Sequence, residues 1–90
     1  MEAIVEASNN GSIRVRSPVA GRLLWLTQYR RGDFLTPRST IAQVITNDGW
    51  GISITMPIAG KIERVSVDPV RDDSVEEGDT ILTLKPPKNR

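Results

Sequence analysis

The chain has 90 residues, enough for one small domain with a modest core, and 38% hydrophobic with 26% charged residues is typical of a globular protein. It contains no cysteine and no histidine, which excludes disulfide bonds, thiolate metal sites and histidine-based acid–base catalysis. We therefore do not expect an enzyme. The apolar runs are only a few residues long, so no membrane-spanning segment is expected either.

Short segments rich in Ile, Val, Leu and Thr follow one another along the chain and predict β-strands. In chain order they are residues 4–7, 12–17, 21–28, 39–46, 50–57, 60–67 and 79–85. Turn residues separate them: Asn-Asn-Gly at 9–11, Arg-Gly-Asp at 31–33, Asp-Gly at 48–49 and Glu-Gly-Asp at 77–79. Apolar Ile13 and Val15 alternate with arginines, the pattern of a strand with one wet face. With no helical periodicity, the sequence predicts an all-β fold.

The most informative feature is an internal repeat. Residues 13–27 align with 52–66 at an offset of 39, and residues 31–44 align with 71–84 at an offset of 40. We therefore expect one extra residue in the loop of the second half. The identical pairs are Ile13 and Ile52, Pro18 and Pro57, Ala20 and Ala59, Gly21 and Gly60, Arg31 and Arg71, Asp33 and Asp73, Thr40 and Thr80, Ile41 and Ile81.

Two similar halves of about forty residues predict a pseudo-twofold domain in which neither half buries its apolar face alone. We divide the chain into an N-terminal strand and turn (1–12), a single domain (13–85) with repeat halves 13–45 and 52–85, and a C-terminal tail (86–90).

Each half has the same expected course. An extended strand reaches a proline, a small Ala-Gly pair makes a close bend, and the next strand turns Leu23 and Leu26, or Ile62 and Val65, inward. Glycine is needed where a Cβ would obstruct the backbone, and proline belongs at bends because it donates no ladder hydrogen bond. We assign structural turn roles to Pro18, Gly21, Gly32, Asp33, Pro57, Gly60, Gly78 and Asp79, and interpret Arg31-Gly32-Asp33 as such a turn rather than an adhesion motif.

The duplicated order of Pro-x-Ala-Gly, apolar strand, Gly-Asp turn and closing strand resembles the biotinyl/lipoyl domain superfamily. "SPVAGRLLWL" followed by "RRGDFLTPRSTIAQV" is also similar to the lipoyl-like half of periplasmic adaptor (membrane fusion) proteins. The resemblance covers residues 13–85 and implies a flattened β-barrel, or barrel-sandwich hybrid, of two pseudo-twofold-related halves. The chain departs from the pattern at Arg38 and Asp72, which stand where turn glycines are usual. It also has "TNDGWG" where many adaptors carry a long helical hairpin.

In that superfamily the hairpin between the halves displays a lysine to which biotin or lipoate is attached. Here the hairpin tip consists of Asn47, Asp48, Gly49 and Trp50, and no lysine occurs between Phe34 and Gly60. We therefore expect no attached cofactor. Asp-Gly suits a tight turn with positive φ, and the duplication leads us to expect the hairpin on the pseudo-twofold axis. Trp50 either contacts a partner or folds back over the end of the barrel, and the sequence leaves both open.

Charge differs between the two halves. Residues 13–45 carry six arginines and one acid (net +5), whereas residues 52–85 carry four basic and seven acidic residues (net −3). This asymmetry favours docking on an acidic protein surface, or on another copy head to tail. The candidate contacts are Trp50, Arg22, Arg30 and Arg31. No nucleic-acid signature accompanies the charge. The acidic run 72–79 lacks the spacing of a calcium loop and is interpreted as a solvated turn, so no metal site is expected.

The sequence thus predicts a non-catalytic, unmodified biotinyl/lipoyl-like interaction module, part of an envelope export or secretion adaptor. That setting implies a periplasmic or membrane-associated location, with the membrane reached only through a parent chain. The alternative is a degenerate or accessory carrier-type domain of a biotin- or lipoate-dependent enzyme system in the cytoplasm.

Overall fold

The computed structural model describes residues 1–68 and 73–86 and confirms the all-β class. Its strands are β1 (Ile4–Ala7), β2 (Ile13–Arg16), β3 (Gly21–Trp25), β4 (Phe34–Leu35), β5 (Thr40–Ile45), β6 (Gly51–Thr55), β7 (Gly60–Val65), β8 (Ser74–Val75) and β9 (Thr80–Leu84). Each predicted segment contains one strand. The two-residue strands β4 and β8 are additions that the sequence did not predict.

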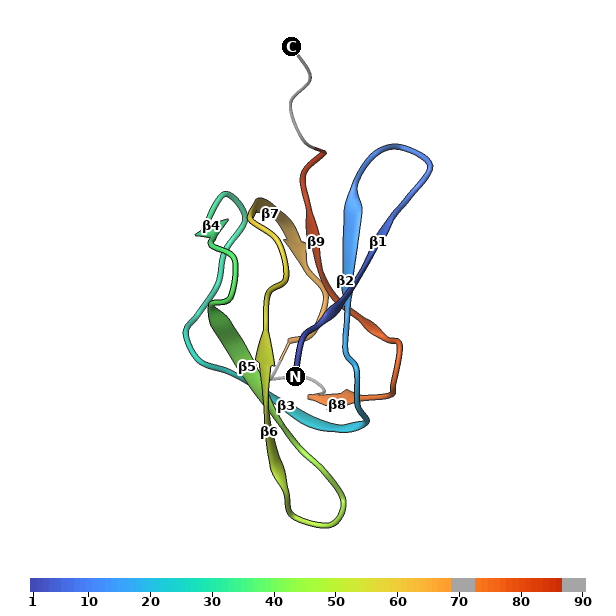
Figure 1. Cartoon of the computed structure of the whole chain (residues 1–90), viewed down its shortest axis with the longest axis vertical. Helices are drawn as coiled ribbons and strands as arrows, with labels where there is room; N and C mark the ends of the chain where they lie inside the picture. Colours follow the sequence, from blue (N-terminus) through green and yellow to red (C-terminus); the bar gives the residue numbers. More distant parts are fainter. Residues whose placement is uncertain (69–72, 87–90) are drawn as a thin grey trace.

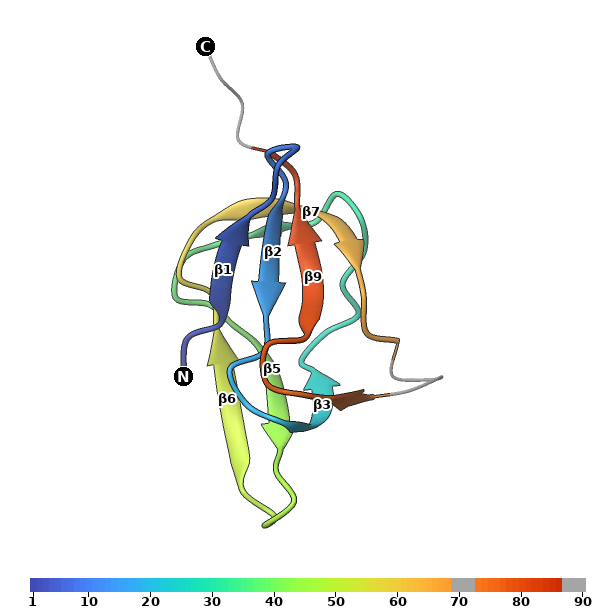
Figure 2. The same ribbon diagram turned by 90° about the vertical axis from the view of Figure 1, so that its right-hand side faces the viewer.

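The strands form two antiparallel sheets, with orders β1-β2-β9-β7-β4 and β6-β5-β3-β8 (Figures 1 and 2). Both sheets contain strands from both repeat halves. If β2 is exchanged with β6, β3 with β7, β4 with β8 and β5 with β9, the four-stranded order becomes β2-β9-β7-β4. That is the five-stranded sheet without β1, so the halves interlock rather than form separate lobes.

The strand register also repeats between the two halves, but the extra residue of the second half lies elsewhere than predicted. Val44 lies opposite Ile52 in the β5–β6 pair, and their repeat counterparts Leu84 and Ile13 lie opposite each other in the β9–β2 pair. The extra residue is not in the loop, as expected, but inside β7, where the pairing with β9 shifts between Ile62 and Arg64. A bulge takes up one residue while the pairing continues on both sides of it.

The residue at this bulge, Glu63, also has a local partner. Its carboxylate accepts a hydrogen bond of 3.0 Å from the buried hydroxyl of Ser12, which precedes β2. The extra residue therefore satisfies a polar group that the core would otherwise leave without a partner.

The core lies between the sheets and draws on both halves. Its fully buried aliphatic residues include Val15, Leu23, Ile41, Val44, Ile54, Ile62, Ile81, Leu82 and Leu84. The inward placement of Leu23 and Ile62 is confirmed, but that of Leu26 is wrong, because its side chain is 56% exposed. Alternate residues of a strand share a face, so Trp25, two residues after Leu23, also packs against the core. Leu26 lies beyond the end of β3 at Trp25.

Residues 1–3 connect the two sheets. The Met1 ammonium group donates to the carbonyl oxygen of Ser53 (2.9 Å), and the Ala3 N–H donates to Thr55 O (2.8 Å), so this segment lies beside the edge of β6. The chain then crosses to the other sheet, where β1 pairs with β2. This segment covers part of the β6 edge, which would otherwise expose unpaired backbone groups.

One turn residue has a conformation that the repeat explains. Arg38 has φ of 66°, and its counterpart in the second half, Gly78, has φ of 90°. Both turns make the same backbone bonds: Arg38 N–H donates to Met56 O, and Gly78 N–H donates to Ser17 O. Arg38 therefore occupies a position at which the second half has glycine.

We expect Arg38→Gly to stabilise the protein by about 0.5–1 kcal/mol, since glycine adopts positive φ without the steric cost that a side chain incurs. The reverse change at the matched turn, Gly78→Arg, is expected to destabilise by a similar amount. Urea unfolding of both variants measures the effect, and a stability loss in Arg38→Gly would contradict the assignment.

Glu6 on β1 forms an ion pair with Arg16 on β2 at 2.7 Å, and Arg14 lies 3.7 Å away. The hydrogen bond and charge of Arg16 hold the pKa of Glu6 below its ordinary value of 4.5. A carboxyl with a lowered folded-state pKa stabilises the fold above its unfolded pKa, and this contribution disappears as the pH falls through the folded value. We expect Glu6→Gln to lose less stability than the wild type on acidification below pH 4.5, as measured by urea unfolding. Equal losses in the two proteins would contradict this.

Candidate interaction site

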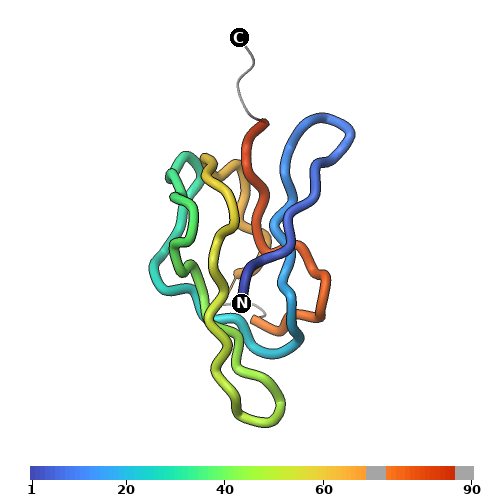
Figure 3. The backbone as a smooth tube through the Cα atoms, in the orientation of Figure 1, coloured from blue at the N-terminus to red at the C-terminus, as the bar shows by residue number. Residues whose placement is uncertain are grey.

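The β5–β6 hairpin forms one end of the molecule (Figures 1, 2 and 3). Its tip is closed by three hydrogen bonds that all involve Thr46: its N–H donates to Trp50 O (2.9 Å), its carbonyl accepts from Gly49 N–H (2.9 Å), and its hydroxyl accepts from Trp50 N–H (3.1 Å). Gly49 has φ of 89°, the positive value expected for the Asp-Gly pair. The tip is thus an ordered loop with its own bonding.

The side chains at the tip face solvent. Trp50 is 70% exposed, and Asn47, Asp48 and Gly49 are exposed as well. Of the two alternatives for Trp50, the structure excludes folding back over the end of the protein. A tryptophan this exposed on an ordered tip is a candidate contact residue, because tryptophan is enriched among the residues that dominate binding energy.

The lysines in the described residues lie away from this hairpin. Lys61 is the second residue of β7 and Lys85 follows β9, and the N–H of Lys85 donates to the carbonyl oxygen of Lys61 (2.8 Å). Lys85 directly follows the end of β9, and β9 ends at the side of the molecule opposite the hairpin (Figures 1 and 2). The hairpin therefore presents no primary amine.

The expected place of the hairpin on the pseudo-twofold axis is wrong. Exchanging the halves carries the end of β5 and the start of β6 onto the end of β9 and the start of β2. These two places are at opposite ends of the molecule (Figure 1). The hairpin thus has a counterpart, the junction of Leu84 with Ile13, where no loop connects the strands.

The predicted arginine contacts are not gathered at one place. Arg22 lies opposite Ile45 at the base of the hairpin, and its guanidinium binds the carboxylate of Asp73 through Nε (3.2 Å) and Nη2 (3.0 Å). Arg30 and Arg31 are exposed in the loop before β4, toward the other end (Figure 1). Because the halves interlock, the charge difference between them does not divide the molecule into a basic and an acidic lobe.

Six of the eight predicted turn residues lie in or beside bends and turns of the backbone, whereas Gly21 and Gly60 are the first residues of β3 and β7. Pro18 and Pro57 stand in bends before β3 and β7, and Gly32 has φ of 95°. The carboxylate of Asp33 accepts the N–H of Arg30 (2.9 Å), and that of Asp79 accepts the N–H of Glu76 (2.8 Å). Both aspartates therefore close tight turns.

The acidic run 72–79 begins outside the described residues, at Asp72. Of its described members, Asp73 binds Arg22 and Asp79 closes its turn. Within residues 1–68 and 73–86, no group of three or more possible metal ligands lies together. The same residues contain no helix that could span a membrane.

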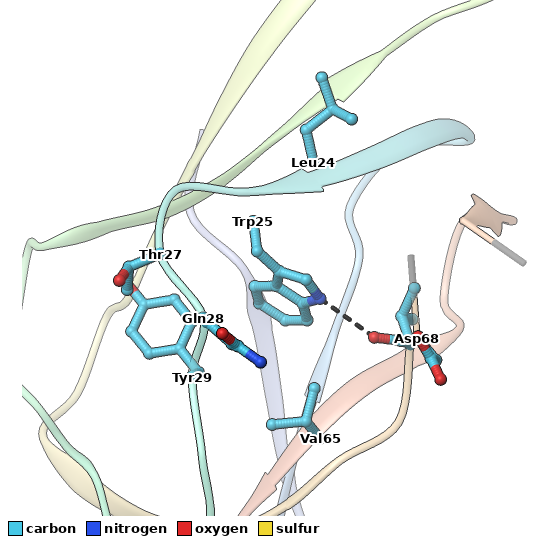
Figure 4. A pocket seen from close by; sticks show the side chains of 8 residues that line it. Leu24, Trp25, Thr27, Gln28, Tyr29, Val65 and Asp68 are labelled. Carbon is cyan, nitrogen blue, oxygen red and sulfur yellow. Dashed lines mark hydrogen bonds between the residues drawn. The ribbon is translucent and has the colours of Figure 1, made fainter. Parts of the chain in front are cut away.

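An open recess lies beside β3 and β7, and sequence reasoning did not identify it (Figure 4). Its volume is about 650 Å³, and it is lined by Leu24, Trp25, Thr27, Gln28, Tyr29, Val65, Val67 and Asp68. The indole N–H of Trp25 donates to Val67 O (3.1 Å), and its ring meets Tyr29 edge to face at 5.7 Å. Partial burial raises the pKa of Tyr29, with a further contribution from Asp33. Both aromatic side chains are thus held by neighbours within the chain.

A second recess, of about 530 Å³, lies at the end opposite the hairpin. It is lined by Ile13, Phe34, Ala59, Gly60, Lys61, Leu84, Lys85 and Pro86. Phe34, on the edge strand β4, is 63% exposed. The repeat could have indicated this site, because its alignment matches the aromatic Phe34 with the small polar Ser74.

Comparison with protein-family models finds no match, and neither curated proteins nor solved structures yield one.

Proposed function

We propose that this chain is a non-catalytic protein-interaction module, an unmodified biotinyl/lipoyl-like domain whose central hairpin presents a tryptophan instead of an attachment lysine. The observation that carries the proposal is the 70% exposure of Trp50 on a tip closed by three hydrogen bonds. A large aromatic side chain that is exposed to water on an ordered loop is typical of an interaction site, where a binding partner covers the ring.

The barrel-sandwich fold is part of the proposal. It is supported by the two sheets that exchange strands between halves, by the repeated register, and by the bonds of residues 1–3 to β6. In a carrier of this superfamily, the same hairpin would need a reachable amine. The tip has an Asp and an Asn at the relevant places, and neither can form that amide.

The setting we propose is an envelope export or secretion adaptor, in which this module joins a larger assembly and reaches a membrane only through a parent chain. Its support is the resemblance of residues 17–44 to the lipoyl-like half of adaptors.

The unmodified state is tested by intact mass after co-expression with a biotin ligase and a lipoate ligase. We expect the mass of the bare chain, because the hairpin offers no amine. A biotinyl or lipoyl adduct on the wild type would overturn the proposal in favour of a carrier-type domain. A known carrier domain expressed alongside it shows that both ligases are active.

The role of Trp50 is tested by cross-linking in cells with a photoreactive residue at Asn47. Proteins captured by the wild-type hairpin should be lost from the Trp50→Ala variant and kept by Leu26→Ala. Leu26 is a matched control because it is also exposed, at 56%, but lies just past β3 rather than on the hairpin. Equal capture by all three proteins would contradict a contact role for Trp50.

A further inference from the structure

We propose that the partner of the hairpin is a second copy of this chain, which receives it in the recess between β4, β7 and the end of β9. This inference rests on the proposed function, since it takes Trp50 as the contact residue. In the assembly, the tip of one copy enters the recess at the opposite end of the next copy, so that copies join head to tail.

The recess has an apolar floor and a basic rim. Leu84 is fully buried beneath it, Ile13 is partly buried, and the exposed ring of Phe34 forms one wall. Lys61 and Lys85 stand at its edge. Neither lysine forms an ion pair with any residue in the described part of the chain. Such a site suits an apolar side chain that is accompanied by a carboxylate.

The equivalent positions in the other repeat half show which features of the recess the fold itself requires. The counterpart of Phe34 is Ser74, equally a member of a two-residue edge strand, so the fold does not need an aromatic ring there. The counterpart of Lys61 is Arg22, which is paired with Asp73. Asp33, the counterpart of Asp73, instead bonds the backbone of Arg30. The exposed ring is therefore an addition to the shared scaffold, and among the described residues Lys61 lacks the ion pair that its counterpart Arg22 makes.

The hairpin tip has the complementary chemistry. Trp50 provides a large flat apolar group, and Asp48, two residues earlier, provides the only charge between Thr46 and Gly51. The recess volume of about 530 Å³ lies in the range of about 300–1,000 Å³ that ligand pockets have. A carboxylate entering beside Lys61 and Lys85 would meet opposite charge, which guides orientation.

The position of the two surfaces determines the kind of assembly. They lie at opposite ends of the molecule, so one chain cannot bring its own hairpin to its own recess (Figure 1). An interface made of two different surfaces is heterologous, and each added copy leaves one hairpin and one recess free. We therefore expect chains of copies that lengthen with concentration, rather than a closed dimer.

Sedimentation velocity over a range of concentrations tests this directly. The wild type should grow in mean mass with concentration. Trp50→Ala and Phe34→Ala should each weaken self-association by about 30-fold, the change expected for truncation of a dominant contact residue. Leu26→Ala should associate like the wild type. Because all three side chains are exposed, thermal unfolding should show folded variants.

Mixing the two defective variants is the decisive measurement. Trp50→Ala retains its recess and Phe34→Ala retains its hairpin, so an equimolar mixture should form heterodimers and nothing larger. Asp48→Lys alone should weaken association, and combining Asp48→Lys with Lys61→Asp and Lys85→Asp in one chain should restore it at least in part.

Three outcomes would overturn the inference: a wild type that stays monomeric at millimolar concentration, a mixture of the two variants that stays monomeric, or an equal loss in Leu26→Ala. A monomeric wild type whose Asn47 cross-linker still captures another protein in a Trp50-dependent way would overturn self-association alone. The proposed interaction role would then stand with a different partner.

Discussion

Replacing Gly21 with alanine is expected to lower the free energy of unfolding by about 3–5 kcal/mol, a large share of the stability of a small domain. A Cβ at this position would lie 2.3 Å from the carbonyl oxygen of Ile45 and 2.8 Å from Cγ1 of Val44. The backbone itself has φ of 154°, which side chains rarely adopt. Because the obstructing atom belongs to the backbone of β5, relief requires β3 and β5 to separate at the base of the hairpin.

Two glycines serve as matched controls for this variant. At Gly60, the repeat counterpart, the new Cβ would meet the side chain of Leu84 at 2.7 Å, and a side chain can rotate away. At Gly49, φ is also positive but nothing lies within 4 Å, so only the conformational cost of about 1–2 kcal/mol applies. Urea unfolding followed by far-UV circular dichroism ranks the three. If Gly49→Ala were as damaging as Gly21→Ala, the close approach of β3 to β5 would not be the cause.

Residue composition and alternation allowed the sequence to predict the seven longer strands. The repeat allowed it to predict the need for glycine at Gly21 and Gly60, because each half repeats the same steric requirement. The strands β4 and β8 were not predicted because they are very short. Two residues are too few to show an alternating pattern, and their pairing with β7 and β3 depends on contacts that are distant in sequence. The position of the extra residue was missed for another reason: the sequence alignment matches Leu26 with Val65 at an offset of 39, whereas the strand register makes Trp25 equivalent to Val65, at an offset of 40.

The site was predictable in its chemistry and not in its geometry. The absence of a lysine from residues 46–50 follows directly from the sequence. Whether Trp50 faces water depends on how the tip closes on Thr46, which no periodicity encodes. The recess around Phe34 was missed because its members come from β2, β4, β7 and β9 and meet only when the halves interlock.

The second large effect is expected for truncations of buried side chains in the core. Leu23→Ala and Ile62→Ala should each lower the free energy of unfolding by about 2–5 kcal/mol, the usual cost of truncating a fully buried aliphatic side chain. The two residues occupy equivalent positions, opposite Val44 and opposite Leu84. Leu24→Ala is the matched control on the outer face of β3, where the side chain is 43% exposed, and it should cost less than about 1 kcal/mol.

The informative result is the shape of the unfolding curve. Because each sheet contains strands from both halves, damage at Leu23 removes support from strands of the second half, and damage at Ile62 does the same to the first. Both variants should therefore unfold in a single transition, with tryptophan fluorescence, from Trp25 and Trp50, and circular dichroism giving the same midpoint. Two separated transitions would mean that the halves are independent units. In that case the hairpin and the Phe34 recess would not be held at opposite ends of one cooperative unit, and head-to-tail assembly would lose its structural basis.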